Sequence, residues 1–279
     1  MNLYDAHNHF HFPALLPHRA QVTADLRAIN LRRAVVNGTA EEEWPVVSAL
    51  AAEHDWILPS YGIHPWDAGN RSPNYLTALR ARLLAEPASQ VGEIGLDRWI
   101  IDDLRPDDPR LAGLRVASID EQTEVFSAQF ALATELHRAA SIHCLRAIGP
   151  LHDLLCTAKL PARGFLLHAY SGPLELVRPL ADLGAYFSYN GYFLQARHAA
   201  KSRVFSAVPL ERLLVETDAP AMELPVPHRR FTLPDTPTRE RVNHPANLAA
   251  TYTALAQIRG LAVETLATRV EENFQRLFC

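Results

Sequence analysis

Short apolar runs alternate with longer amphipathic segments along the whole chain. The runs have the length of buried strands, and the segments between them repeat apolar residues at helical intervals, as Phe126 and Phe130 do. Eight such pairs follow one another, and parallel strands joined by helices in this order close into a barrel. The pattern therefore predicts an α/β fold, the TIM or (β/α)₈ barrel, with residues 1–279 as a single domain.

The predicted elements cover most of the chain. Strands are predicted at 2–6, 32–38, 56–65, 89–97, 139–144, 164–170, 184–191 and 212–218. Helices are predicted at 22–30, 41–55, 75–85, 121–138, 147–158, 173–183, 196–208, 246–258 and 263–277. Two stretches are irregular: 98–119 is charged, and 222–237 contains Pro225, Pro227, Pro234 and Pro237. Each follows a predicted strand, so each either shapes access to a site at the barrel rim or is a plain surface connection.

Composition limits the partners and the location. The chain is 48% hydrophobic, and its net charge of −4 and pI of about 6.3 give no overall basic field for binding duplex nucleic acid. Three cysteines, none in a CxxC pair, indicate reduced thiols in a cytoplasmic protein. No apolar run reaches the ~18 residues of a membrane span, and the N-terminus lacks a signal-peptide pattern, so we expect no membrane association.

Six side chains that could bind a metal ion stand at the C-terminal ends of five predicted strands. They are His7, His9, Glu93, His143, His168 and Asp218. A (β/α)₈ barrel carries its reactive groups at these strand ends, so the six should converge. Each histidine alone is more often a hydrogen-bonded core residue, and Glu93 alone could pair with Arg98. Together, four imidazoles and two carboxylates predict a site for two divalent ions, Mg²⁺, Mn²⁺ or Zn²⁺.

The two carboxylates and one further histidine have predicted catalytic roles. Glu93 would bridge the two ions, because a carboxylate has two oxygens and such ions lie ~3.5–4 Å apart. Two ions lower the pKa of a water between them, and Asp218 would orient or deprotonate that water. His64 ends the third predicted strand and would donate to the negative charge that develops on the substrate; the alternative is a core or loop histidine.

Three neighbouring residues are expected to have supporting or unrelated roles. Asp5 could orient a histidine of the site, since it lies on the same face of its strand as His7. Glu216 is expected on the opposite face from Asp218, in a buried support contact. His11 is expected to be a loop residue rather than a ligand.

Several other chemistries are disfavoured. The chain has no glycine-rich phosphate loop and no GxSxG nucleophile elbow. Neither lysine, Lys159 or Lys201, ends a predicted strand. A barrel hydrolase that bridges its metals through a carboxylated lysine on strand four is therefore disfavoured, because Glu93 occupies that position.

The motifs and their order resemble the TatD family of metal-dependent hydrolases over nearly the whole chain. The matching segments are DAHNH, GIHPW, VGEIGLD, EVFSAQFALATEL, IHC, HAYSG, VETDAP and PANLAATYTALAQIRGL…NFQRLF. The resemblance implies a barrel with a two-metal site and deoxyribonuclease or other phosphodiesterase activity. It implies His7, His9, Glu93 and Asp218 around one ion, and Glu93, His143 and His168 around the other. His64 matches the family's substrate-contacting histidine.

The chain departs from the family pattern near the site. Phe10-His11 stands where the family usually has Leu-Asp, and Cys144-Leu145-Arg146-Ala147 replaces Ser-Arg-Asp/Glu-Ala. HAYSG replaces HCFSG, and the stretch 98–119 is longer than expected. None of these changes removes a predicted metal ligand. They bear on the substrate more than on the chemistry.

The predicted function is a cytoplasmic, divalent-metal-dependent hydrolase that cleaves phosphodiester bonds, in the manner of a deoxyribonuclease or exonuclease. Its expected substrate is single-stranded DNA or frayed DNA ends, because the net negative charge favours a short substrate held at the metals. No obligate protein partner is inferred. Two alternatives stay open: a hydrolase of small phosphoesters or of amide or ester bonds, and a metal-binding protein without turnover.

Overall fold

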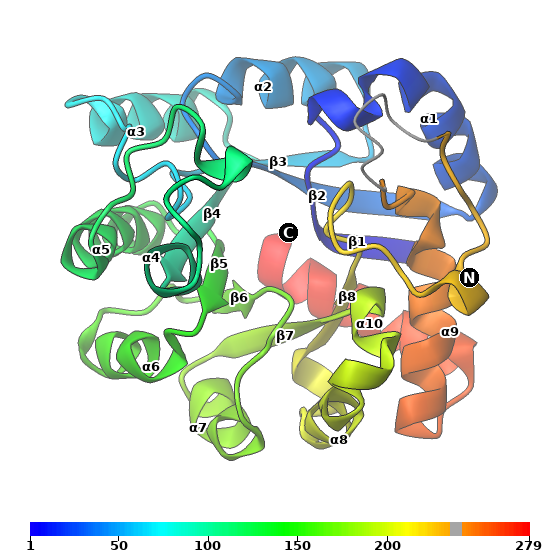
Figure 1. The fold of residues 1–279 in the computed structure, drawn as a ribbon. Coiled ribbons are helices and arrows are strands. Elements are labelled where there is room, and N and C mark those ends of the chain that lie inside the picture. The colour runs from blue at the N-terminus through cyan, green and yellow to red at the C-terminus, as the bar shows by residue number, and fades with distance from the viewer. Residues whose placement is uncertain (235–241) are drawn as a thin grey trace.

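Eight parallel strands form one sheet that curves into a barrel in the order of the chain (Figure 1). The computed structural model describes residues 1–234 and 242–279. The strands are β1 (Leu3–Asn8), β2 (Leu31–Gly38), β3 (Ile57–Tyr61), β4 (Gln90–Asp97), β5 (Ala140–Leu145), β6 (Phe165–Leu167), β7 (Ala185–Asn190) and β8 (Leu213–Glu216). The prediction of a (β/α)₈ barrel is confirmed. Strands β3, β6 and β8 are shorter than expected.

Helices surround the strands on the outside (Figure 1). They are α1 (Arg19–Ala28), α2 (Trp44–Glu53), α3 (Tyr75–Ala85), α5 (Ile119–Glu135), α6 (Ile148–Thr157), α7 (Val177–Asp182), α8 (Ala200–Ala207), α9 (Leu248–Arg259) and α10 (Val263–Phe278). Helix α5 begins after Ser118, whose Oγ accepts a hydrogen bond from the backbone nitrogen of Glu121. Helix α9 ends at Gly260, whose φ of 61° suits glycine.

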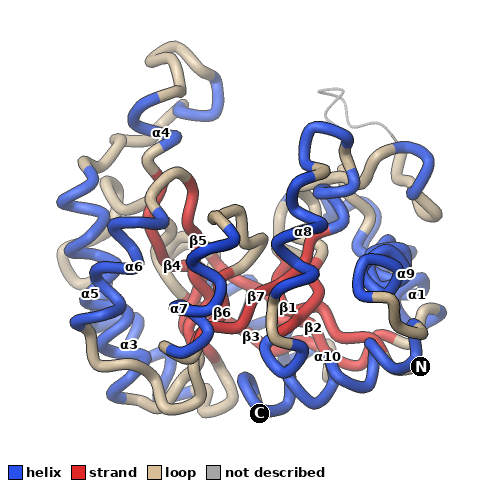
Figure 2. The backbone as a smooth tube through the Cα atoms, turned by 90° about the horizontal axis from the view of Figure 1, so that it is seen from below, coloured by secondary structure: helices blue, strands red, loops and turns tan. Residues whose placement is uncertain are grey.

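Helix α10 lies at the N-terminal end of the strands (Figure 2). Its apolar side chains recur every three to four residues and are buried: Leu266, Val270, Phe274 and Leu277. This face packs against β1 and β8. The end of the barrel opposite the predicted site is therefore covered, and the C-terminal ends of the strands remain available for chemistry.

The first and last strands meet at a seam that side chains hold together. The strand pairing runs from β1 through β8, and β8 lies beside β1. Asp5 Oδ1 accepts from the backbone nitrogen of Thr217 at 3.0 Å, and its Oδ2 accepts from Thr217 Oγ1 at 2.6 Å. Just past β8, the backbone nitrogen of Asp218 donates to the carbonyl of His7 at 2.9 Å. The seam thus places residues from both ends of the chain beside each other.

The predicted role of Asp5 needs a correction. Its carboxylate accepts from the backbone nitrogen of His7 at 3.2 Å, and this is its contact with a histidine of the site. Asp5 therefore positions His7 through the main chain and closes the barrel, instead of orienting an imidazole ring.

The two irregular stretches lie at the C-terminal end of the strands. The stretch 98–119 contains the short helix α4 (Trp99–Asp102) and a 3₁₀ turn (Pro109–Leu111), and α4 projects at the end opposite α10 (Figure 2). The second stretch contains a 3₁₀ turn at Val226–His228; its last predicted residues, Pro237 among them, lie outside the described residues.

Side chains anchor the base of the stretch 98–119. The backbone nitrogen of Arg115 donates to Asn70 Oδ1 at 2.7 Å, and Asn70 Nδ2 donates to the carbonyl of Gly113 at 2.8 Å. The guanidinium of Arg115 also pairs with Glu121 on α5, at 2.6 Å. The stretch is thus fixed to the loop after β3 and to a barrel helix.

No helix in residues 1–234 or 242–279 is both long and apolar enough to span a membrane.

Replacing Tyr252 with phenylalanine should destabilise the protein. The Tyr252 hydroxyl, on α9, accepts from the backbone nitrogen of Tyr4 at 3.1 Å and donates to its carbonyl at 2.9 Å, in a buried position. Its loss leaves two buried backbone groups of β1 unpaired, which costs about 1–3 kcal/mol of unfolding free energy. Equilibrium unfolding in urea measures this.

Tyr189→Phe is the matched control. The Tyr189 hydroxyl is also buried but has no hydrogen-bond partner among the described residues, so its removal should leave the unfolding free energy equal or higher. Equal losses in the two variants would show that the hydrogen bonds of Tyr252 do not matter.

Candidate metal centre

The six predicted ligands come together at the C-terminal ends of the strands. Three lie within strands, and three lie just past strand ends, where the chain turns: His9 follows β1, His168 follows β6, and Asp218 stands two residues after β8. His9 keeps its place because its backbone nitrogen donates to the carbonyl of Ala219 at 2.7 Å. The expectation that these six side chains converge agrees with the structure.

Glu93 lies at the centre of the cluster, with one oxygen toward each half. Its Oε2 is 3.2 Å from Nε2 of both His7 and His9. Its Oε1 is 2.8 Å from His168 Nε2 and 3.1 Å from His143 Nδ1.

The second carboxylate completes one half of the cluster. Asp218 Oδ1 lies 3.3 Å from His9 Nε2 and 3.6 Å from His7 Nε2. Three overlapping groups have ligand atoms within 4.8 Å of one another: His7, Glu93 and His168; His7, His9 and Asp218; His64, Glu93 and His143. Glu93 belongs to two of these three groups, in agreement with its central position.

Positive charge around Glu93 decides its ionisation. Burial, which leaves 3% of the residue exposed, would raise the pKa of this carboxyl. The imidazoles of His168, His64 and His7 outweigh burial and hold the pKa well below its ordinary value. Glu93 is therefore a carboxylate, as a metal-bridging role requires. Arg98 does not pair with it; its guanidinium contacts Asp102 at 3.1 Å, which removes the ion-pair alternative.

Hydrogen bonds on the far side of the rings set which nitrogen faces the cluster. His9 Nδ1 donates to the carbonyl of Asn37 at 2.8 Å, so Nε2 is the nitrogen that faces the cluster and can bind an ion once it has lost its proton. His143 Nε2 lies 3.1 Å from Asp97 Oδ2, so its Nδ1 faces Glu93. Asp97 is nearly fully buried and also accepts from Trp66 Nε1 at 2.8 Å.

Glu216 supports His168 from inside the barrel. Its Oε1 is 3.6 Å from His168 Nδ1, and the carboxylate also accepts from Asn190 Nδ2 at 3.1 Å and from the Ser188 hydroxyl. The predicted support contact is present, but the expected opposite face is wrong. The contact with the His168 ring places the Glu216 carboxylate on the side of β8 that faces the cluster.

The carboxylates give the cluster an affinity for cations. Burial lowers the pKa of His9 and of His143, but the neighbouring carboxylates reverse this and raise them to about 10 and about 9. Protons thus supply positive charge that divalent ions could replace. Four imidazoles and two carboxylates, with ring nitrogens fixed from behind, are a donor set that fits two such ions.

Of two further histidines, His64 lies beside the cluster and His11 lies outside it. His64 Nε2 is 3.5 Å from Glu93 Oε1, closer to the cluster than a pure substrate contact requires. His11 instead pairs with Glu43 Oε2 at 3.0 Å and contacts no carboxylate of the cluster, in agreement with its expected exclusion from the ligands.

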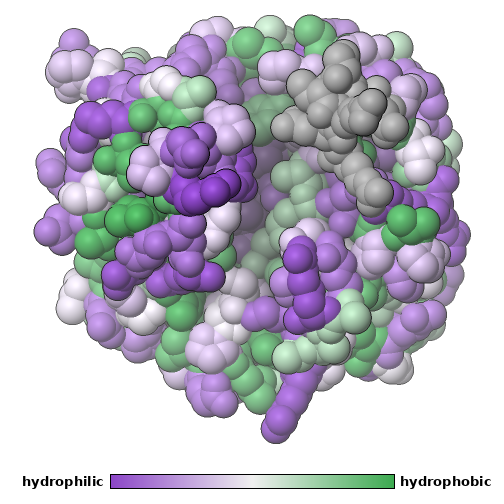
Figure 3. Space-filling model, in the orientation of Figure 1, coloured by the Kyte–Doolittle hydropathy of each residue, from purple (hydrophilic) through white to green (hydrophobic). Residues whose placement is uncertain are grey.

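The cluster forms the floor of a cavity of about 780 Å³. The space-filling view shows a hollow near the centre of this face (Figure 3). Beyond the cluster, its walls include aromatic and basic side chains: Phe12, Trp66, Trp99, Arg110, Tyr192, Phe193 and His198. Sequence reasoning missed these and Asp97. The even spacing of Asp97 from Glu93 on one strand was the available signal for Asp97.

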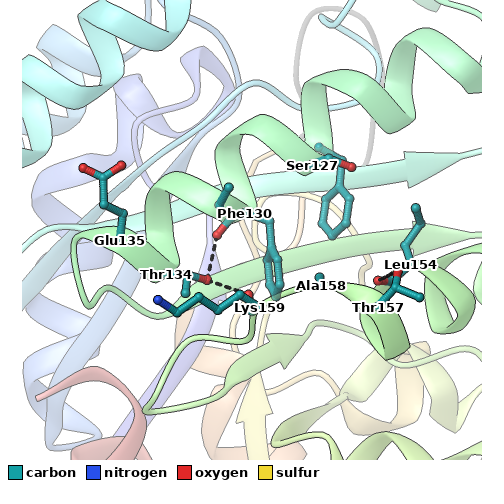
Figure 4. A pocket seen from close by; sticks show the side chains of 10 residues that line it. Ser127, Phe130, Thr134, Glu135, Leu154, Thr157, Ala158 and Lys159 are labelled. Carbon is teal, nitrogen blue, oxygen red and sulfur yellow. Dashed lines mark hydrogen bonds between the residues drawn. The ribbon is translucent and has the colours of Figure 1, made fainter.

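A second cavity, of about 410 Å³, lies outside the barrel between α5 and α6 (Figure 4). Its lining includes Phe130, Leu154 and the Thr134 hydroxyl, which is 3.0 Å from the carbonyls of Phe130 and Lys159. Its one carboxylate, Glu135, is paired with Arg80 at 2.6 Å. No group of metal-binding side chains among the described residues lies in it, so the candidate site is the larger cavity.

Comparison with known proteins gives a consistent result. A family model described as TatD related DNase matches residues 4–279. The chain is 29% identical over 261 residues to the 3'-5' ssDNA/RNA exonuclease TatD of Klebsiella pneumoniae, covering 92% of this chain and 90% of that protein. It is 30% identical over 230 residues to the metal-dependent hydrolase YcfH of Escherichia coli, covering 82% of this chain and 76% of that protein.

A solved structure shows the same architecture. The crystal structure of YJJV, a TatD homologue from Escherichia coli, superposes with a TM-score of 0.81 at 27% identity, over 99% of this chain and 97% of that one. The structure of a TatD-family hydrolase from Entamoeba histolytica gives the same TM-score at 15% identity and so bears on the fold alone.

Binding of Zn²⁺ or Mn²⁺ to the metal-free protein should release protons. The raised pKa values of His9 and His143 mean that these rings carry protons near neutral pH, and a ring nitrogen must lose its proton before it binds an ion. Calorimetric titrations in two buffers with different ionisation enthalpies should therefore give different apparent binding enthalpies. Equal enthalpies in both buffers would contradict the proposed ligand set.

Proposed function

Because this chain belongs to the TatD-related DNase family of metal-dependent hydrolases, we propose that it cleaves phosphodiester bonds with the help of two divalent ions. The proposed substrate is single-stranded DNA or the frayed end of a duplex. The proposed metals are Mg²⁺, Mn²⁺ or Zn²⁺, because a mixed set of imidazoles and carboxylates accepts each of them. We treat residues 1–279 as one catalytic domain.

The observation that carries this proposal is the position of the Glu93 carboxylate. Each of its oxygens faces a separate set of imidazole nitrogens, within 3.2 Å. Two ions bound there would supply Lewis-acid charge for a phosphodiester and lower the pKa of a water molecule. Glu93 would then fix the distance between the two ion sites, because it contributes one oxygen to each. The other proposed ligands are His7, His9 and Asp218 at one site and His143 and His168 at the other.

Asp218 is the proposed proton acceptor. It lines the cavity, and its Oδ1 lies 3.3 Å from His9 Nε2. Burial would raise its pKa, but the hydrogen bond and charge of His9 lower it below the ordinary value, which keeps the group ionised. An ionised carboxylate at the cavity floor can orient an attacking water and accept its proton.

His64 is the proposed donor to the substrate. Its ring lies between the cluster and the cavity wall, 3.5 Å from Glu93 Oε1 and 6.4 Å, centroid to centroid, from the indole of Trp66. A ring nitrogen at this place can donate to a phosphate oxygen as negative charge develops on it.

Relatives and composition support the substrate and the location. The Klebsiella relative is named as an exonuclease of single-stranded DNA and RNA, which supports a nucleic-acid substrate here. The net charge of −4 favours a short strand end held at the metals over a long duplex. Free Cys144, Cys156 and Cys279 support the proposed cytoplasmic location.

An activity assay tests the proposal directly. Metal-free protein is reloaded with Mg²⁺, Mn²⁺ or Zn²⁺ and given end-labelled single-stranded DNA, single-stranded RNA, blunt duplex DNA, bis(p-nitrophenyl) phosphate and p-nitrophenyl phosphate. Metal-dependent cleavage of single strands and of the diester supports the proposal. Turnover of the monoester alone would favour the small-phosphoester alternative, and stoichiometric metal binding without any turnover would favour a binding protein.

Glu93→Ala should abolish activity and weaken the binding of both ions, because it removes the shared ligand from both halves of the site. Calorimetry or anomalous scattering measures the two ions separately. Two ions bound with undiminished affinity would overturn the bridging role.

His64→Ala is the matched comparison, since this histidine contacts the same carboxylate without being assigned as a ligand. It should keep its metal content and lose about 10²–10³ in kcat, the effect of removing one donor to developing charge. Loss of an ion instead would make His64 a ligand of the group that it forms with Glu93 and His143.

Asp218→Asn keeps the size and one ligand oxygen but removes the charge that accepts a proton. It should lose most of kcat with a smaller change in KM, because the defect lies in the transition state. The acid limb of the wild-type pH–rate profile should report a value shared between Asp218 and the water, and not the pKa of one residue. A variant with near wild-type kcat at saturating metal would exclude Asp218 as the base.

A further inference from the structure

One wall of the active-site cavity is aromatic. Trp66, from the loop after β3, and Trp99, from α4, both line the cavity and are half-buried. The other two tryptophans, Trp44 and Trp56, are 3% and 7% exposed and belong to the core. The two tryptophans that are partly open to water are therefore the two beside the metal centre, where they border the cavity.

The two open indoles lie nearly parallel. Their planes differ by 22° and their ring centroids are 6.2 Å apart. At this separation the rings are either offset or spaced apart, and in both cases neither ring fully covers the face of the other. Both indoles also line the cavity, so part of each ring borders the space that a flat aromatic group would enter.

The wall is joined to the metal centre by a short chain of hydrogen bonds. Trp66 Nε1 donates to Asp97 Oδ2 at 2.8 Å, and the same oxygen is 3.1 Å from His143 Nε2. The other nitrogen of His143 faces Glu93 at 3.1 Å. Asp97 thus links the indole of Trp66 to His143, a proposed metal ligand. A group attached to a phosphate at the metals would lie beside this indole.

The outer part of the wall is also held in place. The guanidinium of Arg110 lies 4.9 Å from the ring centroid of Trp99, and Asp108 fixes it through two hydrogen bonds of 2.8 and 2.7 Å. All three residues belong to the stretch 98–119, whose base is anchored on Asn70 and Glu121. The length of the stretch therefore allows Arg110 to fold back onto the ring of Trp99 at the cavity wall.

We propose that Trp66 and Trp99 form a stacking site for a nucleobase next to the scissile phosphate. This inference rests on the proposed function and specifies its substrate: the enzyme binds a nucleotide through its base as well as through its phosphate. Stacking on aromatic faces tolerates any base, because every base has a π face. The site thus favours an unpaired nucleotide without selecting a sequence, because a paired base is already stacked within its duplex.

The test compares two single-stranded oligonucleotides that differ only at their terminal nucleotides. One carries adenine at both ends, and the other carries an abasic tetrahydrofuran at both ends, so the polarity of cleavage does not matter. Stacking of one base corresponds to a KM roughly 5- to 150-fold lower for the adenine substrate. Trp99→Ala should lose much of this difference in KM between the two substrates, and Trp99→Phe should restore part of it.

Ile101→Ala is the matched control. Ile101 lies on the same helix, is 38% exposed and does not line the cavity. It should keep the wild-type preference for adenine. If Trp99→Ala and wild type discriminate equally, or if wild type does not discriminate, the stacking site is overturned while phosphodiester cleavage stands.

A binding measurement separates this inference from the proposed function. In the presence of a chelator, dAMP should quench tryptophan fluorescence, deoxyribose 5-phosphate should not, and Trp99→Ala should lose most of the quenching. If the wild-type protein cleaves neither oligonucleotide, the proposed function fails. The fluorescence quenching by dAMP would still test whether a base stacks on the two tryptophans. Equal quenching by dAMP and deoxyribose 5-phosphate would overturn the stacking site on its own.

Discussion

A carboxylate buried in a protein core is unstable as an anion unless hydrogen-bond donors or positive charge surround it. Glu93 is such a carboxylate, and it lies at the centre of the metal site. Four imidazoles meet it within 3.2 Å, from the ends of the three strands β1, β5 and β6. Each imidazole in turn needs its outer nitrogen satisfied, which accounts for the carbonyl of Asn37 behind His9 and for Asp97 behind His143. The polar groups behind His9 and His143 therefore follow from one buried charge.

The proposed metal ligands and the walls of the cavity come from different parts of the chain. Strand ends hold the cluster, and strands are positioned by the barrel as a whole, so the cluster is rigid. The walls of the cavity come from segments that the barrel does not require, above all the stretch 98–119. Such a division lets the reaction stay constant while the preferred substrate changes with the loop. This division agrees with the sequence differences from the family pattern, which change residues around the site and lengthen the stretch 98–119 but leave the predicted ligands in place.

Periodicity and strand-end position were enough to predict the barrel, the order of its elements and the six clustered side chains, because these depend on spacing along one strand. Side-chain contacts between segments that are far apart in the sequence could not be predicted from this spacing. Nothing near Asp97 in sequence indicates His143 as its partner, and Arg98 bonds to Asp102 rather than to Glu93. The role of Asp5 also depends on Thr217, which is 212 residues away.

The seam between β1 and β8 bears on when this protein can become active. His7 and His9 leave the ribosome long before Asp218, because most of the barrel lies between them in the sequence. The seam that brings them together also needs Thr217, and the barrel end beneath it is covered by the last helix. A nascent chain that has not yet reached Asp218 therefore cannot assemble the full ligand set. The metal centre can form only after the ribosome has passed the residues of both strands that make the seam.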